Sequence, residues 1–122
     1  MRRVPTVVVS DVDRAERHRA LMTLLGGRPP GAKCTVFAAD AATLDQLQAE
    51  PQIDVRLAPA ACPCCVGQVA FRFALTRLLR ESAPQYLIIE LPGGPHAPRI
   101  EAMLRDHFFS AVLDLVTERR AT

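Results

Sequence analysis

The sequence predicts an α/β domain with a mostly parallel sheet flanked by helices. Short apolar, β-branched segments alternate along the 122 residues with longer amphipathic ones, which is typical of parallel strands joined by crossover helices. The segment 85–91, QYLIIEL, is almost wholly apolar, as expected of a strand buried on both faces of such a sheet. A chain of this length can bury a sizeable core, and we expect residues 1–122 to form one domain.

Each element is predicted by its own pattern. Strands are expected where apolar or alternating residues are bounded by turn formers, and helices where a capping residue precedes an amphipathic run. The expected strands are 4–9, 33–39, 53–59, 85–91 and 111–118. The expected helices are 13–27 with Asp11 or Asp13 as N-cap and Gly26 as the stop, 40–50 with Asp40 as cap and Pro51 as the end, 66–82, and 99–109.

Apolar spacing predicts which face of two helices is buried. In the first helix the apolar side is expected to hold Ala15, Leu21, Leu24 and Leu25. In the helix 66–82 the corresponding stripe is expected to hold Val69, Phe73, Leu75 and Leu79. Cys34 lies inside a strand pattern, and we expect it to be a core residue.

Charge and composition argue against nucleic acid and membranes as partners. The net charge is only +2, the arginines are spread along the chain, and Lys33 is the single lysine. Tryptophan is absent and there is one tyrosine, so no platform for stacking bases is visible. The first apolar run is too short for a signal peptide, and no window has the roughly 20 apolar residues of a membrane helix. We therefore expect a cytoplasmic protein with reduced cysteines.

Three of the four cysteines lie within the segment Cys62-Pro63-Cys64-Cys65, between an expected strand and an expected helix. The start of a helix favours thiolates, which are the metal-binding form of cysteine. Thiolates so close together repel one another unless a cation lies among them. A soft or borderline ion such as Zn²⁺, Co²⁺ or Cu⁺ meets that need, so we predict a transition-metal site.

Two further residues are candidates for completing this site. In a parallel sheet, ligands bind at the carboxyl ends of the strands, where the loops 10–17, 58–65 and 91–99 are expected to meet. His96 lies in the last of these loops, and Glu90 ends the buried strand just before it. A carboxylate on a buried strand is costly unless it is paired or functional. The predicted metal ligands are thus Cys62, Cys64, Cys65, Glu90 and His96.

Other interpretations of the cysteines remain open. Cys62 and Cys65 also form a C-x-x-C at a strand-to-helix junction, which is the setting of a thiol–disulfide oxidoreductase. A third cysteine within the motif argues against that chemistry. The sulfur atoms could also simply pack beneath the sheet.

The segment 26–34, GGRPPGAKC, imitates a phosphate-binding loop. It lacks the glycine before Lys33 and the Ser or Thr after it, and it precedes a strand where a true loop would follow one. Pro29 and Pro30 also remove two backbone N–H groups that a phosphate would need. We therefore expect no phosphate site here.

The order of the segments resembles the CobW-type metal-chaperone GTPases. CPCC, a helix ending LLRE, the strand and turn YLIIELPGG and a helix beginning PRIEAML follow one another as that family's C-x-C-C motif, helix, Glu-ending strand and Gly turn do. The matching positions are Cys62, Cys64, Cys65, Glu90 and Gly93. The resemblance covers most of the chain. It implies a fold like the N-terminal part of a P-loop GTPase domain and a role with Zn²⁺ or Co²⁺.

The chain departs from that family where GTP would bind. Asp11, Arg14 and Glu16 stand where the phosphate loop has glycines, Arg17 replaces its lysine, and His18 replaces its Mg²⁺-binding threonine. Carboxylates repel phosphate and side chains keep the backbone from it. The base-recognition motif N-K-x-D is also missing. We therefore expect neither GTP binding nor GTPase activity, and favour a role without catalysis.

Together these observations predict a small metal-binding protein that resembles the metallochaperones. It would store, sense or hand over its metal by thiolate exchange with a recipient protein, and an open strand edge would allow a homodimer. The alternatives are an oxidoreductase using Cys62 and Cys65, and an interaction module without catalytic function.

Overall fold

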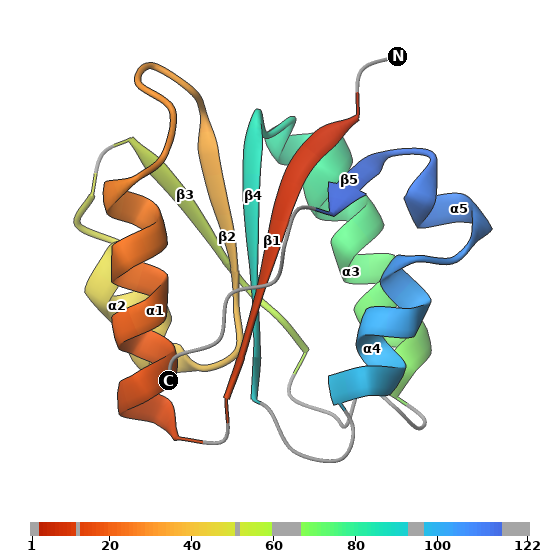
Figure 1. Cartoon of the computed structure of the whole chain (residues 1–122), viewed down its shortest axis with the longest axis horizontal. Coiled ribbons are helices and arrows are strands. Elements are labelled where there is room, and N and C mark those ends of the chain that lie inside the picture. The colour runs from red at the N-terminus through yellow and green to blue at the C-terminus, as the bar shows by residue number, and fades with distance from the viewer. Residues whose placement is uncertain (1–2, 12, 51, 60–66, 93–96, 116–122) are drawn as a thin grey trace.

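The computed structural model describes residues 3–11, 13–50, 52–59, 67–92 and 97–115. They form a five-stranded sheet in which all strands run parallel (Figure 1), so the predicted fold class is confirmed. The strands are β1 (Val4–Asp11), β2 (Cys34–Ala38), β3 (Ile53–Leu57), β4 (Tyr86–Pro92) and β5 (Leu113–Leu115). The helices are α1 (Arg14–Gly26), α2 (Ala41–Leu47), α3 (Gly67–Ser82), α4 (Ala97–Leu104) and α5 (His107–Ser110).

The sheet has the strand order β3-β2-β4-β1-β5. Helices α1 and α2 cover one face, and α3, α4 and α5 cover the other (Figure 1). Each face has its own apolar core. The central strand β4 contributes Leu87, Ile89 and Leu91 to the core under α3–α5 and Ile88 to the core under α1 and α2, as the apolar run 85–91 predicts.

Aspartates begin three of the helices. The Asp13 carboxylate accepts the N–H groups of Ala15 and Glu16 and caps α1, so of the two candidates Asp11 and Asp13 the structure has the second. Asp40 accepts the N–H of Thr43 and caps α2, as predicted. Helix α2 ends at Leu47, earlier than the expected limit at Pro51. None of the described helices combines the length and apolar character needed to cross a membrane.

The expected single helix 99–109 is wrong, because the structure has two helices there. Asp106 accepts the N–H of Phe109 at 2.9 Å and thereby caps a separate short helix, α5. A turn then delays the last strand to Leu113, two residues later than expected. Residues 116–118 of that expected strand lie outside the described residues.

The predicted buried face of α3 is also wrong in part. Phe71, Leu75 and Leu78 are fully buried, whereas Val69 and Phe73 are 74% and 69% exposed. The buried residues follow a spacing of four and three, which places them on the side that the sheet presents. Two exposed apolar side chains are therefore left on the outer side of the helix.

Helix α1 buries a narrower face than expected. Leu21 and Leu25 are buried as predicted, but Leu24 is half-buried and Ala15 is exposed. The buried row continues one turn earlier to Arg17, which is only 4% exposed. A charged residue thus takes the innermost position at the start of α1.

Candidate functional site

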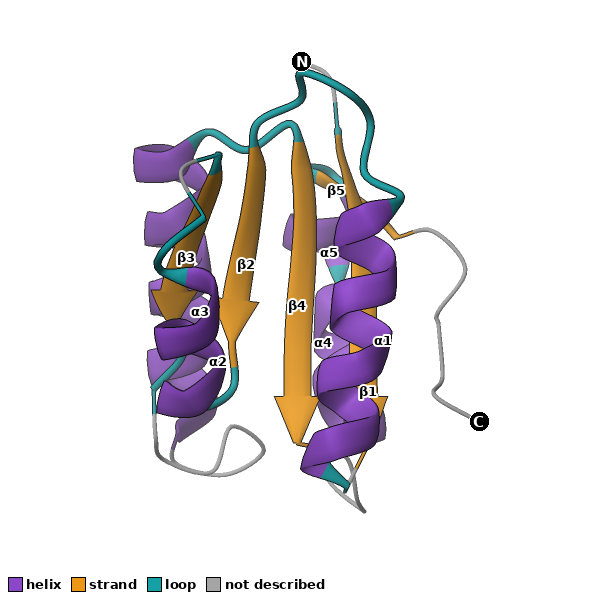
Figure 2. Cartoon of the chain, turned by 90° about the vertical axis from the view of Figure 1, so that its left-hand side faces the viewer, coloured by secondary structure: helices purple, strands orange, loops and turns teal. Residues whose placement is uncertain are grey.

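The carboxyl ends of β1, β2, β3 and β4 all lie at the same end of the sheet (Figure 2). From the neighbouring strands β1 and β4 the chain passes to opposite faces, since α1 lies on one face and α4 on the other (Figure 1). Ligand sites of parallel α/β sheets form at such a switch point, in the crevice between the diverging connections. Glu90, near the end of β4, pairs in register with Val9 of β1 at this position.

Glu90 is a fully buried carboxylate that is held from three directions. Its Oε2 accepts hydrogen bonds from Arg17 Nε at 2.9 Å and from Thr43 Oγ1 at 3.1 Å. Its Oε1 accepts the backbone N–H of Ala39 at 2.8 Å. The partners come from α1, from α2 and from the end of β2, so this single side chain connects three separate segments.

Asp40 is the second carboxylate of this cluster. Its Oδ1 accepts the N–H of Thr43 at 3.0 Å, and its Oδ2 accepts from Arg17 Nη2 at 3.1 Å and lies 3.2 Å from Arg14 Nε. Burial by itself would raise the pKa of Asp40. The Thr43 N–H and the positive charges of Arg14 and Arg17 outweigh burial, so the pKa lies below its ordinary value.

Arg17 joins the two carboxylates. Its side chain is 5% exposed, and it uses Nε for Glu90 and Nη2 for Asp40. A buried charge costs several kcal/mol unless paired, so each member of this group depends on the others. We call Arg17, Asp40, Thr43 and Glu90 the buried arginine cluster.

Sequence reasoning assigned Arg17 only to the place of a missing lysine and did not find this cluster. One signal was available. Arg17 precedes Leu21 and Leu25 at a spacing of four, which puts it in the row that faces the sheet. A buried arginine at the start of this row and a buried glutamate near the end of the strand 85–91 have opposite charges and could be expected to pair.

Of the five predicted metal ligands, only Glu90 lies within the described residues. Its two oxygen atoms accept the three hydrogen bonds given above, and these bonds would compete with a metal for the carboxylate. Cys62, Cys64, Cys65 and His96 lie outside the described residues. Among the residues that are described, no group of three His, Cys, Asp or Glu side chains could hold a metal ion.

The two stretches that contain these residues connect elements that the structure describes. The stretch 60–66 joins the carboxyl end of β3 to the start of α3, and the stretch 93–96 joins the carboxyl end of β4 to the start of α4. The strand ends and helix starts that flank both stretches lie at the end of the sheet where the strands have their carboxyl ends (Figure 2). The buried arginine cluster belongs to the same end. The places of the cysteines and of His96 within these stretches stay predictions.

Cys34, the fourth cysteine, is a core residue as expected. It is fully buried within the core under α1 and α2. Burial raises the pKa of its thiol to about 11, against a small opposing effect of Arg28. The thiol is therefore protonated at neutral pH, and it lacks the reactivity of a thiolate.

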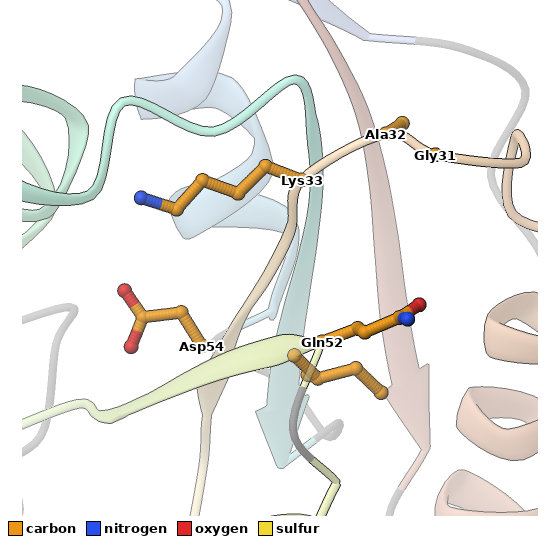
Figure 3. A pocket seen from close by; sticks show the side chains of 6 residues that line it. Gly31, Ala32, Lys33, Gln52 and Asp54 are labelled. Atoms are coloured by element: carbon orange, nitrogen blue, oxygen red, sulfur yellow. The ribbon is translucent and has the colours of Figure 1, made fainter.

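The segment around Lys33 lies at the other end of the sheet, where the strands begin. Gly31, Ala32 and Lys33 before β2, together with residues 52–54 of the β3 start, line an open hollow of about 560 Å³. Figure 3 shows Lys33 and Asp54 extending to the same side, while Gln52 extends to the other. Because Asp54 offsets the lysine charge, this hollow has none of the charge excess expected of a phosphate site.

Comparison with protein-family models, with curated proteins and with solved structures found no match for this chain. The fold and site therefore define a class only: an all-parallel α/β domain with a buried charge cluster at its switch point.

Proposed function

We propose that this protein binds a transition metal, Zn²⁺ or Co²⁺ in the first place, through Cys62, Cys64 and Cys65, and passes it on to a recipient protein. The observation that carries the proposal is the position of these cysteines in the chain. In the sequence they follow the parallel strand β3 and precede the long helix α3, and folds of this class bind ligands where such strands end. The resemblance to CobW-type chaperones implies the same role, in which the metal is a cargo held by exchangeable thiolates.

His96 is the best candidate for a fourth ligand. The connection from β4 to α4 that carries it starts at the switch point, and imidazole is a common partner of thiolates around Zn²⁺. Glu90 we assign to a different task. With Arg17, Ala39 and Thr43 as its partners, it holds the ends of β2 and β4 and the start of α1 in place.

The hydrogen bonds at the start of α1 support a role without GTP. A phosphate at a helix start is bound by backbone N–H groups and a nearby cation. The N–H groups of Ala15 and Glu16 donate to the Asp13 carboxylate, at 2.8 and 3.3 Å. The Arg17 guanidinium donates to Glu90 and Asp40. Carboxylates of the chain itself thus occupy the groups that a nucleotide would use.

The test is a Co²⁺ titration of the reduced chain under anaerobic conditions. Thiolate ligands give a sulfur-to-cobalt charge-transfer band, and added Zn²⁺ should abolish it by competition. Changing Cys62, Cys64 or Cys65 to Ser should weaken binding by roughly tenfold or more, since each thiolate contributes more than about 1.4 kcal/mol. The matched control is Cys34→Ala, which removes a buried thiol and should leave the affinity unchanged.

Two further variants separate the roles of the remaining candidates. His96→Ala should weaken the metal complex, whereas Glu90→Gln should lower the stability of the fold and leave metal affinity as it was. Loss of metal binding in a folded Glu90→Gln variant would instead make Glu90 a ligand. No metal uptake, together with a reversible Cys62–Cys65 disulfide, would replace the proposal by the oxidoreductase. If the chain neither took up metal nor formed this disulfide, the interaction module would be the remaining alternative.

A further inference from the structure

Strand β3 ends the sheet beside β2, and its other side faces no described strand (Figure 2). Its backbone groups alternate in direction, as in every strand. The Ala58 N–H donates to Ala38 O at 2.8 Å, so even-numbered residues direct their groups toward β2. Val55 and Leu57 therefore direct theirs toward the open side. A strand of another chain can pair there.

The order of charges along β3 is self-complementary. Two copies of β3 that run antiparallel about a two-fold axis at Val55 would place Asp54 of each copy opposite Arg56 of the other. Ile53 would then lie opposite Leu57, so apolar residues also meet. A two-fold axis at Asp54 or at Arg56 would instead bring like charges directly together, which is unfavourable. Charge complementarity therefore selects one register.

The two charged side chains lie on the face of the sheet that α3 covers. Arg56 Nε lies 3.1 Å from Asp54 Oδ1, and Arg56 Nη1 lies 3.1 Å from Glu81 Oε1 on α3. These side chains are only partly exposed, at 38% for Arg56 and 29% for Asp54. Both are already held by these contacts, so pairing with a second copy would order few additional groups.

Exposed apolar surface continues from this edge onto α3, which lies at the β3 end of the sheet (Figure 2). Leu57 and Phe73 are 47% and 69% exposed. Together with Arg56, Ala70 and Ala74 they line an open groove of about 440 Å³. A second copy seated on β3 would bring its own α3 toward this groove. The pairing would thereby remove from water the apolar side chains that one copy leaves exposed.

We propose that β3 is a dimerisation edge, at which two copies pair antiparallel about Val55 and form one continuous ten-stranded sheet. This inference does not depend on metal binding. It does have a consequence for the cysteines. Because the two β3 strands run in opposite directions, the connections that follow them leave from opposite ends of the interface. The proposed pairing therefore does not require the two copies to share one set of cysteines.

The test uses the full chain with reductant and a chelator, so that disulfides and bridging metals cannot join two copies. Sedimentation from micromolar to millimolar concentration should give the mass of two chains. Asp54→Arg and Arg56→Asp should each raise the dissociation constant by about tenfold or more, because each places like charges opposite one another twice per dimer. An equimolar mixture of the two variants should restore the dimer, since opposite charges then face each other again.

A second pair of variants keeps the test decisive if charge reversal disturbs folding. Phe73→Ser alters an exposed residue beside the edge and should weaken the dimer. Phe108→Ser alters another exposed aromatic, which is 47% exposed and lies on α5 beside β5 at the other side of the sheet, and should not. A monomer at all concentrations would overturn the proposal. So would a dimer that neither Phe73→Ser nor the charge reversals affect, or a mixture that fails to reassociate.

Discussion

Two arginines in this protein each lie between two carboxylates, and they differ mainly in burial. Arg17 contacts Asp40 and Glu90 with a side chain that is 5% exposed. Arg56 contacts Asp54 and Glu81 with a side chain that is 38% exposed. The distances are almost the same, 2.9 and 3.1 Å around Arg17 and 3.1 Å for both contacts of Arg56. Similar ion pairs therefore occur in two environments, one buried and one partly exposed to water.

The difference teaches what an ion pair can contribute. Around Arg56, water competes for every charge, so the contacts add little to stability but can select a partner by sign. Around Arg17, the guanidinium group and the Glu90 carboxylate have lost their water, and removing one of them leaves the other uncompensated. We therefore expect the buried arginine cluster to control folding and the β3 edge to control association.

The largest effect is expected for Arg17→Met. This change keeps much of the side-chain volume but leaves Glu90 and Asp40 without their shared cation, and we expect a loss of about 3 to 5 kcal/mol in the free energy of unfolding. Urea denaturation at neutral pH measures it. Arg14→Met is the control, because Arg14 contacts the same Asp40 with a side chain that is 69% exposed. Equal losses for the two variants would contradict the role of burial.

A smaller effect is expected for Asp40→Asn, and it should depend on pH. The pKa of Asp40 is lowered in the folded protein, so its ionised form stabilises the fold above the unfolded value of about 3.9. That contribution is lost as the pH falls through the lower, folded pKa. Asparagine still caps α2 but cannot titrate.

Denaturant unfolding at pH 7 and again at about pH 3 checks this prediction. The variant should be less stable than the wild type at pH 7. It should also lose less stability than the wild type on acidification, since the hydrogen bonds and ion pairs of the ionised Asp40 carboxylate weaken when it takes up a proton. Identical acid sensitivity of the two proteins would assign the effect to other carboxylates.

The smallest effect on folding is expected for Arg56→Ala. A partly exposed ion pair contributes less than about 1 kcal/mol, so the free energy of unfolding of the monomer should change little. Unfolding is followed at concentrations low enough for the monomer to predominate, and association is measured separately. A clear loss of dimer without a comparable loss of stability is the expected pattern. A strong destabilisation of the monomer would remove the contrast with Arg17.

Much of the fold could be predicted because its determinants are local. Apolar strands and aspartate caps such as Asp13 and Asp40 act within a few residues, and they place most elements correctly. The failures arise where two local patterns overlap. Asp106 interrupts an apparently continuous helix, and in α3 both Phe71 and Phe73 are apolar while only one can face the sheet.

The candidate site divides in the same way. The cysteine motif can be recognised from the sequence alone, and both its place in the fold and its metal binding stay predictions. The buried arginine cluster could not be derived, because Arg17, Asp40 and Glu90 are up to 73 residues apart. Glu90 was expected to be either paired or functional, and the structure shows it paired.

The sequence by itself determined the α/β class and the alternation of strands and helices along the chain. Periodicity and capping depend on neighbours along the chain, so they can be seen before folding. Only the tertiary structure decided which arginine is buried, which phenylalanine is exposed and which strand stays open. These outcomes depend on how helices settle on the sheet, where the loss of water turns equal contacts into unequal energies.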